Sequence, residues 1–298
     1  MINKSTFLLA ALCSAYSFAQ TSVVDLPNVS AVAVTNKVEP PQRPAAVTVQ
    51  RGPYLQSGTP TSVVVKWRTD VPTESVVHYG KKLSSLSKKA SSNTLTTEHQ
   101  VALSGLSPNT KYYFNIGNKA GVLSESTSGD MYVITSPLAG TKQFVRAWIL
   151  GDAGTANNNQ RDVRDAYYDY VDAAPKNTGK TDMMLFLGDN AYGSGTDEEY
   201  QNALFDIYDE MLKKSVAWSC LGNHDGKSAD SATQSGPYYD IFTFPTAAQA
   251  GGTASGTEAY YSFDYANVHF IILDSHHTSR EVGGAMYNWT LTDIQNTK

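Results

Sequence analysis

Short runs of apolar residues recur along the second half of the chain, and they end beside a glycine or a carboxylate. These runs cover residues 144–150, 183–187, 216–221 and 268–273. Continuous apolar runs are typical of strands that are buried on both faces. Helical spacing separates them, first over residues 162–171 and then from Thr196, where Glu199 completes a capping box. The alternation predicts an α/β domain over residues 140–298.

The first half of the chain has a different pattern, with brief β-branched and aromatic stretches and no helical spacing. Residues 63–67 and 75–79 are predicted strands, residues 69–73 a turn-rich break around Pro72, and residues 111–116 an alternating strand. Short strands at this spacing predict a β-sandwich over residues 46–137. The predicted fold class is therefore α/β, with a β-sandwich ahead of the α/β domain.

The N-terminus has the pattern of a processing signal. Lys4 precedes an apolar stretch at residues 7–12, and residues 17–19 supply small residues for cleavage before Gln20. We predict a signal peptide over residues 1–19, an extended proline-rich linker over residues 20–45, and a secreted, periplasmic or extracellular protein. A lipid anchor at Cys13 is the alternative, but Leu12 stands where a small residue is expected.

Composition narrows the function classes. The chain has 298 residues, 41% of them hydrophobic and 17% charged, as in an ordinary globular protein, and its net charge is −5. This charge provides no global positive field for nucleic acid or anionic lipid. After the predicted cleavage Cys220 is the only cysteine, and it is expected to be a small buried hydrophobe.

Three motifs follow the apolar runs. They are Gly151-Asp152-Ala153-Gly154, Gly188-Asp189-Asn190-Ala191-Tyr192 and Gly222-Asn223-His224-Asp225. Ligands bind at the carboxyl ends of strands in open α/β sheets, so these polar residues are expected to converge. Their oxygen and nitrogen donors suit iron, manganese, zinc or magnesium, and one aspartate can bridge two ions about 3.5–4 Å apart.

On these motifs, residues 140–298 resemble the N-terminal part of the metallophosphoesterase (calcineurin-like) domain, and in particular its purple acid phosphatase branch. Gly154 stands where many relatives carry a histidine, and Tyr192 supplies an aromatic ligand instead. Residues 51–56 and 105–114 resemble a fibronectin type III-like domain of the kind that opens these phosphatases. The resemblance implies an α/β/β/α sandwich, which is incomplete here.

The resemblance also implies roles. Asp152 and Tyr192 resemble ligands of a ferric ion, Asp189 the bridging carboxylate, and Asn223 a ligand of a divalent ion (Fe, Zn or Mn). His224 resembles the catalytic histidine that binds phosphate and assists the leaving group. The implied activity is that of a secreted acid phosphatase acting on small-molecule phosphomonoesters, without nucleic-acid partners.

The pattern departs from the family near the C-terminus, because its last two histidine motifs are absent after His277. We therefore expect a C-terminally truncated sequence, inactive or weakly active alone. A phosphodiesterase or nucleotidase of the same superfamily and a non-catalytic secreted adhesion or binding module remain alternatives. Asp225 is expected to orient His224, and His276 and His277 are weaker candidates for lining the pocket.

Overall fold

The computed structural model describes residues 46–174 and 180–297. The predicted signal peptide and linker lie outside these residues and stay predictions. The chain divides into two units, Met1–Ala45 and Ala46–Lys298, and only the second is described. Within the described ranges, no helix has the length and apolarity needed to cross a membrane.

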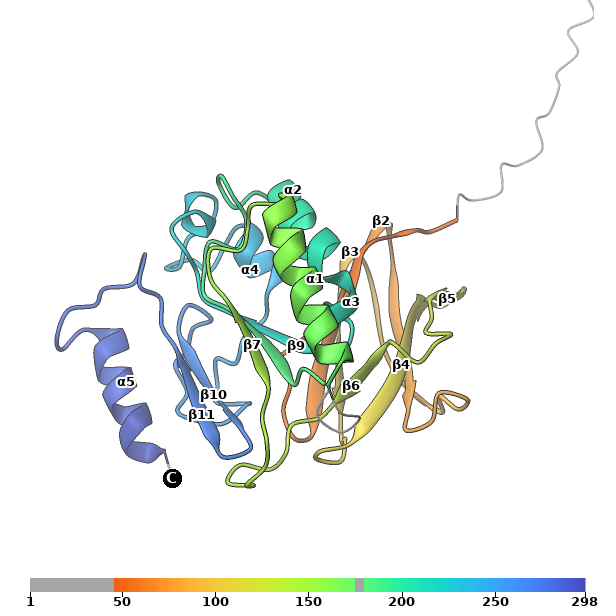
Figure 1. Cartoon of the computed structure of the whole chain (residues 1–298), viewed down its shortest axis with the longest axis horizontal. Coiled ribbons are helices and arrows are strands. Elements are labelled where there is room, and N and C mark those ends of the chain that lie inside the picture. Colours follow the sequence, from red (N-terminus) through yellow and green to blue (C-terminus); the bar gives the residue numbers. More distant parts are fainter. Residues whose placement is uncertain (1–45, 175–179, 298) are drawn as a thin grey trace, which may run out of the picture. The chain divides into compact units, whose positions relative to one another are not determined.

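The N-terminal half of the second unit is built from antiparallel strands (Figure 1). β2 is central: it pairs with β1, β3 and β4, while β5 and β6 pair with β4. Alternate side chains of β2 enter the core, and Val63, Val65 and Trp67 are fully buried. The strands are β1 (Val49–Gln56), β2 (Ser62–Gly80), β3 (Lys88–Ser104), β4 (Lys111–Asn118), β5 (Gly121–Ser124) and β6 (Tyr132–Ile134).

The predicted break at residues 69–73 is wrong, because β2 is one strand of 19 residues. Its register against β3 shifts between Arg68 and Thr73 and again between Thr73 and Ser75. Pro72 lies between these shifts. A proline lacks the N–H that a regular ladder requires, and a bulge tolerates it. The turn-like composition therefore marks an irregularity within a strand.

The C-terminal half carries the predicted parallel strands. β7 (Ala147–Leu150), β8 (Met183–Phe186) and β9 (Val216–Ser219) are parallel neighbours. α1 (Asn158–Asp172) follows β7, and α2 (Asp197–Tyr200), the π-helical turn η1 (Gln201–Phe205) and α3 (Asp206–Leu212) precede β9. The predicted capping box at the start of α2 is confirmed, with Thr196 and Glu199 bonded reciprocally.

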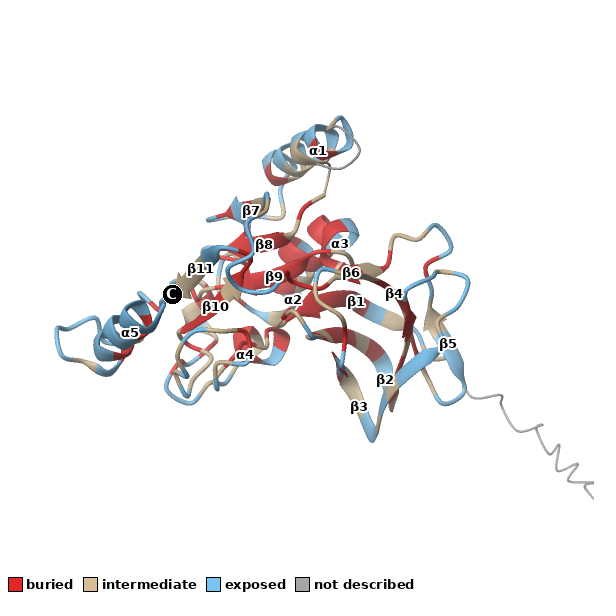
Figure 2. Cartoon of the chain, turned by 90° about the horizontal axis from the view of Figure 1, so that it is seen from below, coloured by how far each residue is buried: buried red, intermediate tan, exposed pale blue. Residues whose placement is uncertain are grey.

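Burial on both faces holds for only two of the four predicted strands. β8 and β9 are buried throughout, whereas Ile149 in β7 is 56% exposed and no residue of β11 is buried (Figure 2). β7 is the last strand in its sheet, and β11 (Val268–Ile272) pairs only with β10 (Tyr261–Tyr265) among the described residues. The prediction is wrong there because an apolar run does not reveal a strand's position in the sheet. The remaining elements are the 3-10 turn η2 (Asp225–Lys227), α4 (Pro237–Ile241) and α5 (Ala285–Asn296).

β1 joins the two halves into one sheet. It runs antiparallel to β2 and parallel to β9, so the order is β5-β4-β2-β1-β9-β8-β7. Side chains strengthen this joint: Tyr54 donates to the Ile241 carbonyl at 2.9 Å, and Lys66 donates to the Asp240 carbonyl at 3.0 Å. The sandwich-like half and the α/β half thus share a continuous hydrogen-bonded framework.

We predict that His99 makes the protein less stable in acid. Its ring stacks on Trp67 at 4.6 Å, and burial lowers the pKa of His99 to about 4. In the unfolded chain His99 binds a proton below about pH 6.5, whereas in the folded chain it does so only near pH 4. The free energy of unfolding should therefore decrease as the pH is lowered from about 6.5 to about 4. Urea titrations at several pH values should show that the free energy of unfolding decreases less toward acid in His99→Gln than in the wild type. The exposed His276→Gln is the control, and an equal decline in His99→Gln and the wild type would contradict the assignment.

Candidate metal centre

The first two motif aspartates lie where parallel strands end. Asp152 follows β7 and Asp189 follows β8, and the Asp152 amide donates to the Gly188 carbonyl at 3.2 Å. Both aspartates have left-handed backbone conformations, with φ of 53° and 52°. Such conformations are costly for residues with a side chain and concentrate at functional sites. The backbone therefore turns abruptly and directs both aspartates to the same sheet edge.

Tyr192 brings the two carboxylates together. Its hydroxyl oxygen lies 2.6 Å from Asp152 Oδ1 and 3.1 Å from Asp189 Oδ2, so its single proton is shared between the two carboxylates. Partial burial and these two carboxylates raise the pKa of the Tyr192 hydroxyl. A bound cation would act in the opposite direction and favour the phenolate. Three oxygen atoms from two motifs thus converge on one place.

The third motif approaches from the end of β9. The His224 amide donates to Asp189 Oδ1 at 2.8 Å, and the His224 ring packs edge-on against Tyr192 at 4.4 Å. His224 Nδ1 lies 2.7 Å from the Gly193 carbonyl oxygen, and Lys227 Nζ lies 3.0 Å from that nitrogen. Asn223 is exposed on the same loop. Its side chain makes no hydrogen bond to any residue that the structure describes.

Gly222 permits this close approach. A Cβ at position 222 would lie 2.1 Å from the Asp189 backbone nitrogen and 2.3 Å from Asp189 Oδ1. Both separations are shorter than real Cβ atoms show, and the obstacle at 2.1 Å is backbone that cannot swing aside. The glycine is therefore required so that the second and third motif loops can touch.

Asp225 does not orient the His224 ring, so that expectation is wrong. Its buried carboxylate accepts hydrogen bonds from the Gly222 amide at 2.9 Å, from the Asn190 side chain at 3.1 Å and from the Tyr200 hydroxyl. Burial raises its pKa, and the hydrogen bonds oppose that rise. Asp225 instead connects the second motif, the third motif and α2.

Asn190 and Tyr200 are site-building residues that sequence reasoning missed. Asn190 is 3% exposed and also donates to Ser219 Oγ at 3.1 Å and the Cys220 carbonyl at 3.3 Å. The position of Asn190 inside the second motif could have indicated its role. No sequence pattern indicates the role of Tyr200, because its contact with Asp225 spans 25 residues.

The other candidate residues have separate surroundings. A Cβ at Gly226 would lie 2.5 Å from His276 Cδ2, so the loop of His276 and His277 packs against η2 beside the third motif. His269 lies away from the motifs, between Asp264 at 2.7 Å and Asp293 at 2.8 Å. Cys220 lies just after β9 and is half-buried, so the expectation of a fully buried cysteine is wrong. Burial raises the pKa of its thiol to about 11.

The donor chemistry of the cluster suits a hard cation. Within residues 46–174 and 180–297, no three His, Cys, Asp or Glu side chains gather as a metal site, and no lysine or arginine forms an ion pair with Asp152 or Asp189. The cluster instead combines two carboxylates with a phenol. Adjacent carboxylates without a cationic side chain favour a positive ion between them, and phenolate is a hard anionic donor. The residues present therefore fit part of a metal centre.

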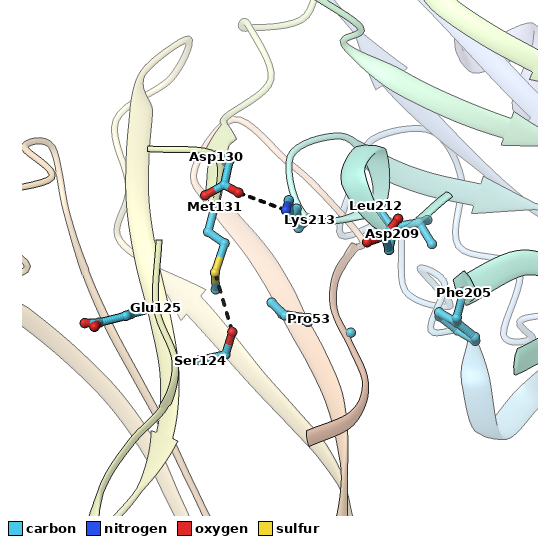
Figure 3. A pocket seen from close by; sticks show the side chains of 10 residues that line it. Pro53, Ser124, Glu125, Asp130, Met131, Phe205, Asp209, Leu212 and Lys213 are labelled. Atoms are coloured by element: carbon cyan, nitrogen blue, oxygen red, sulfur yellow. Dashed lines mark hydrogen bonds and ion pairs between the residues drawn. The ribbon is translucent and has the colours of Figure 1, made fainter. Parts of the chain in front are cut away.

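A cavity of about 180 Å³ lies elsewhere, at the joint of the two halves (Figure 3). Pro53, Met131 and Leu212 contribute to its wall, and an Asp130–Lys213 ion pair of 2.9 Å crosses it. None of the motif residues lines this cavity. It is a gap in the packing between the two halves and adds nothing to the motif cluster.

We predict that Asp225→Ala destabilises the protein by about 3 kcal/mol, because several buried donors lose one charged acceptor. Asp225→Asn should cost less, since its amide oxygen still accepts. Urea unfolding measures both, with Asp172→Asn on the exposed side of α1 as the control. A loss below about 1 kcal/mol for the alanine variant would show that Asp225 does not connect these segments.

Comparison with known proteins follows the same division of the chain. Purple acid phosphatase N-terminal domains match residues 51–131, and the calcineurin-like phosphoesterase family matches residues 145–293. Arabidopsis thaliana "Purple acid phosphatase 21" is 24% identical over 88% of this chain and 58% of its own length. "Probable inactive purple acid phosphatase 27" from the same plant is 26% identical over 64% of this chain and 32% of its own length.

A solved purple acid phosphatase from yellow lupin (Lupinus luteus) seeds shares the fold. It superposes with a TM-score of 0.56 at 16% identity, covering 83% of this chain and 49% of the lupin chain. This chain therefore spans between about a third and three fifths of the length of these relatives. Half of its residues match the family, so the chain belongs to the calcineurin-like phosphoesterases, and the match of its N-terminal domain places it in the purple acid phosphatase branch.

Proposed function

We propose that the protein is a secreted, dinuclear-metal acid phosphatase that hydrolyses phosphomonoesters of small molecules. The observation that carries this proposal is the Tyr192 hydroxyl, which lies within hydrogen-bonding distance of both Asp152 and Asp189. A phenol and two carboxylates at adjacent strand ends form the donor set expected for a ferric ion. Family membership supports hydrolysis of phosphate esters, and the predicted signal peptide supports secretion.

In this proposal Asp152, Tyr192 and Asp189 would hold the ferric ion, and Asp189 and Asn223 would hold a divalent ion (Fe, Zn or Mn). Asn223 is exposed and directly precedes His224 in the third motif. When bound, the two ions would neutralise charge on the phosphate and activate water for attack. Further ligands would come from residues beyond this cluster.

His224 is the proposed catalytic residue. Nδ1 makes both polar contacts of the His224 ring, at 2.7 Å to the Gly193 carbonyl oxygen and at 3.0 Å to Lys227 Nζ. Nε2 is then the nitrogen that remains for the substrate. In its protonated form it would donate to a phosphate oxygen or to the departing alkoxide. Lys227 donates to the same Gly193 carbonyl at 2.7 Å and would add a positive charge beside a phosphate bound at His224.

A non-catalytic role is the second candidate, because two similar Arabidopsis proteins carry the words "Probable inactive" in their names. Loss of activity in such proteins would follow most directly from loss of metal donors. This chain retains Asp152, Asp189, Tyr192 and Asn223 together with His224. We therefore favour the catalytic proposal.

Metal content and turnover test the proposal directly. We expect the full-length product of this gene to contain two metal ions per chain by elemental analysis and to hydrolyse an aryl phosphate in the acid range. Asp152→Asn should lower iron content, since it removes a charged oxygen donor. A metal-free protein without turnover at any pH would support the non-catalytic module instead.

Tyr192→Phe tests the ferric site by colour. A tyrosinate bound to Fe(III) absorbs visible light, so the wild-type protein should be coloured and this variant colourless. Tyr287→Phe, on the exposed face of α5, is the control and should keep the visible absorption band of the wild type. Persistence of the band in Tyr192→Phe would assign it to another ligand.

A further inference from the structure

Glu199 holds the loop that follows Tyr192. One carboxylate oxygen accepts the Gly193 amide at 2.7 Å, and the other accepts the Ser194 amide at 3.0 Å and the Thr196 amide at 2.9 Å. A capping box requires only the Thr196 contact. Through its hydrogen bonds to Gly193 and Ser194, Glu199 also restrains residues outside its helix, next to the motif cluster.

The same loop contacts the catalytic candidate from its other side. The N–H of the Gly193–Ser194 peptide donates to Glu199. The carbonyl oxygen of the same peptide lies 2.7 Å from His224 Nδ1 and 2.7 Å from Lys227 Nζ. An anion on the N–H polarises a peptide and makes its carbonyl a better acceptor. Glu199 is thus one peptide group away from His224.

The first turn of α2 is in turn fixed to the sandwich-like half. Arg51 of β1 donates to Asp197 Oδ1 at 3.0 Å, and Arg68 of β2 donates to the same oxygen at 2.7 Å. Arg51 also donates to the Gln201 side chain at 2.8 Å and lies 4.5 Å from the centre of the Phe205 ring. The Arg51 side chain is 0% exposed and that of Asp197 is 40% exposed, so solvent reaches this ion pair only from the Asp197 side.

We propose that Glu199 is a positioning residue for His224, and that Arg51 and Arg68 link the sandwich-like half to it through Asp197. The sandwich-like half then has a function in the active site although it contributes no residue to the motif cluster. This inference rests on the proposed function for the role of His224. Its structural part, the restraint of the Gly193–Ser194 peptide by Glu199, can be measured separately.

Two neighbouring glutamates allow a matched test. Glu199→Gln removes the charged acceptor, whereas Glu198→Gln changes an exposed side chain on the same turn. Hydrogen exchange of the Gly193 and Ser194 amides should become about tenfold faster in Glu199→Gln and stay unchanged in Glu198→Gln. Equal exchange in both variants would overturn the positioning role.

Turnover of two esters tests the connection to His224. A nitrophenyl phosphate has a good leaving group, whereas an alkyl phosphate needs a proton on its departing oxygen. In the full-length product, Glu199→Gln should lower kcat for the alkyl ester about tenfold more than for the nitrophenyl ester, with little change in KM. An equal loss for both esters would contradict an effect through His224.

Arg51→Lys provides a milder change if Glu199→Gln folds poorly. Lysine keeps the charge but cannot hold Asp197 and Gln201 together, so exchange at Gly193 and Ser194 should rise by a smaller factor. Unchanged exchange in this variant would remove the sandwich-like half from the proposal. If the wild-type protein hydrolyses neither ester, the proposed function fails, and amide exchange alone then decides the restraint by Glu199.

Discussion

The buried carboxylate of Asp225 is the interaction on which the candidate centre depends. It is the shared acceptor for donors from three segments: Gly222 in the third motif, Asn190 in the second motif, and Tyr200 in α2. Burying a carboxylate is costly unless its oxygens are hydrogen-bonded, and here several donors offset that cost. Asp189 directly precedes Asn190 and His224 directly precedes Asp225. This one group therefore connects the loop of the proposed metal ligands to the loop of the proposed catalytic histidine.

The sheet supplies the platform on which this network rests. β8 and β9 are parallel neighbours, with Phe186 opposite Ser219, so the second and third motifs leave the sheet side by side. The left-handed turn at Asp189 and the absence of a side chain at Gly222 then allow the two loops to touch. β1 continues the sheet into the antiparallel half. The contacts of Arg51 with Asp197 and Gln201 connect that half to the start of α2 and η1.

Sequence patterns predicted the elements well where the signal is local. The α/β alternation, the capping box of α2 and the approach of Asp152 and Asp189 at neighbouring strand ends follow from such patterns, whereas the places of Tyr192 and His224 were expected only from the family resemblance. Asn223 was expected to converge with the two aspartates, and its side chain makes no hydrogen bond to any residue that the structure describes. The continuity of β2 through Pro72 was missed, because pairing with β3 outweighs a turn-like composition. The partners of Asp225 and the exposure of β7 were missed for a related reason: both depend on residues that are distant in sequence, and periodicity carries no information about them.

Anomalous X-ray diffraction at the iron absorption edge, on crystals of the full-length product, tests the central claim most directly. The account predicts an iron peak surrounded by oxygen atoms of Asp152, Asp189 and Tyr192, and a second metal peak that shares Asp189 and lies beside Asn223. Asp225 should keep its hydrogen bonds to Gly222, Asn190 and Tyr200 in the metal-bound protein. Metal peaks remote from these residues, with the Tyr192 hydroxyl still bonded to both carboxylates, would contradict the account.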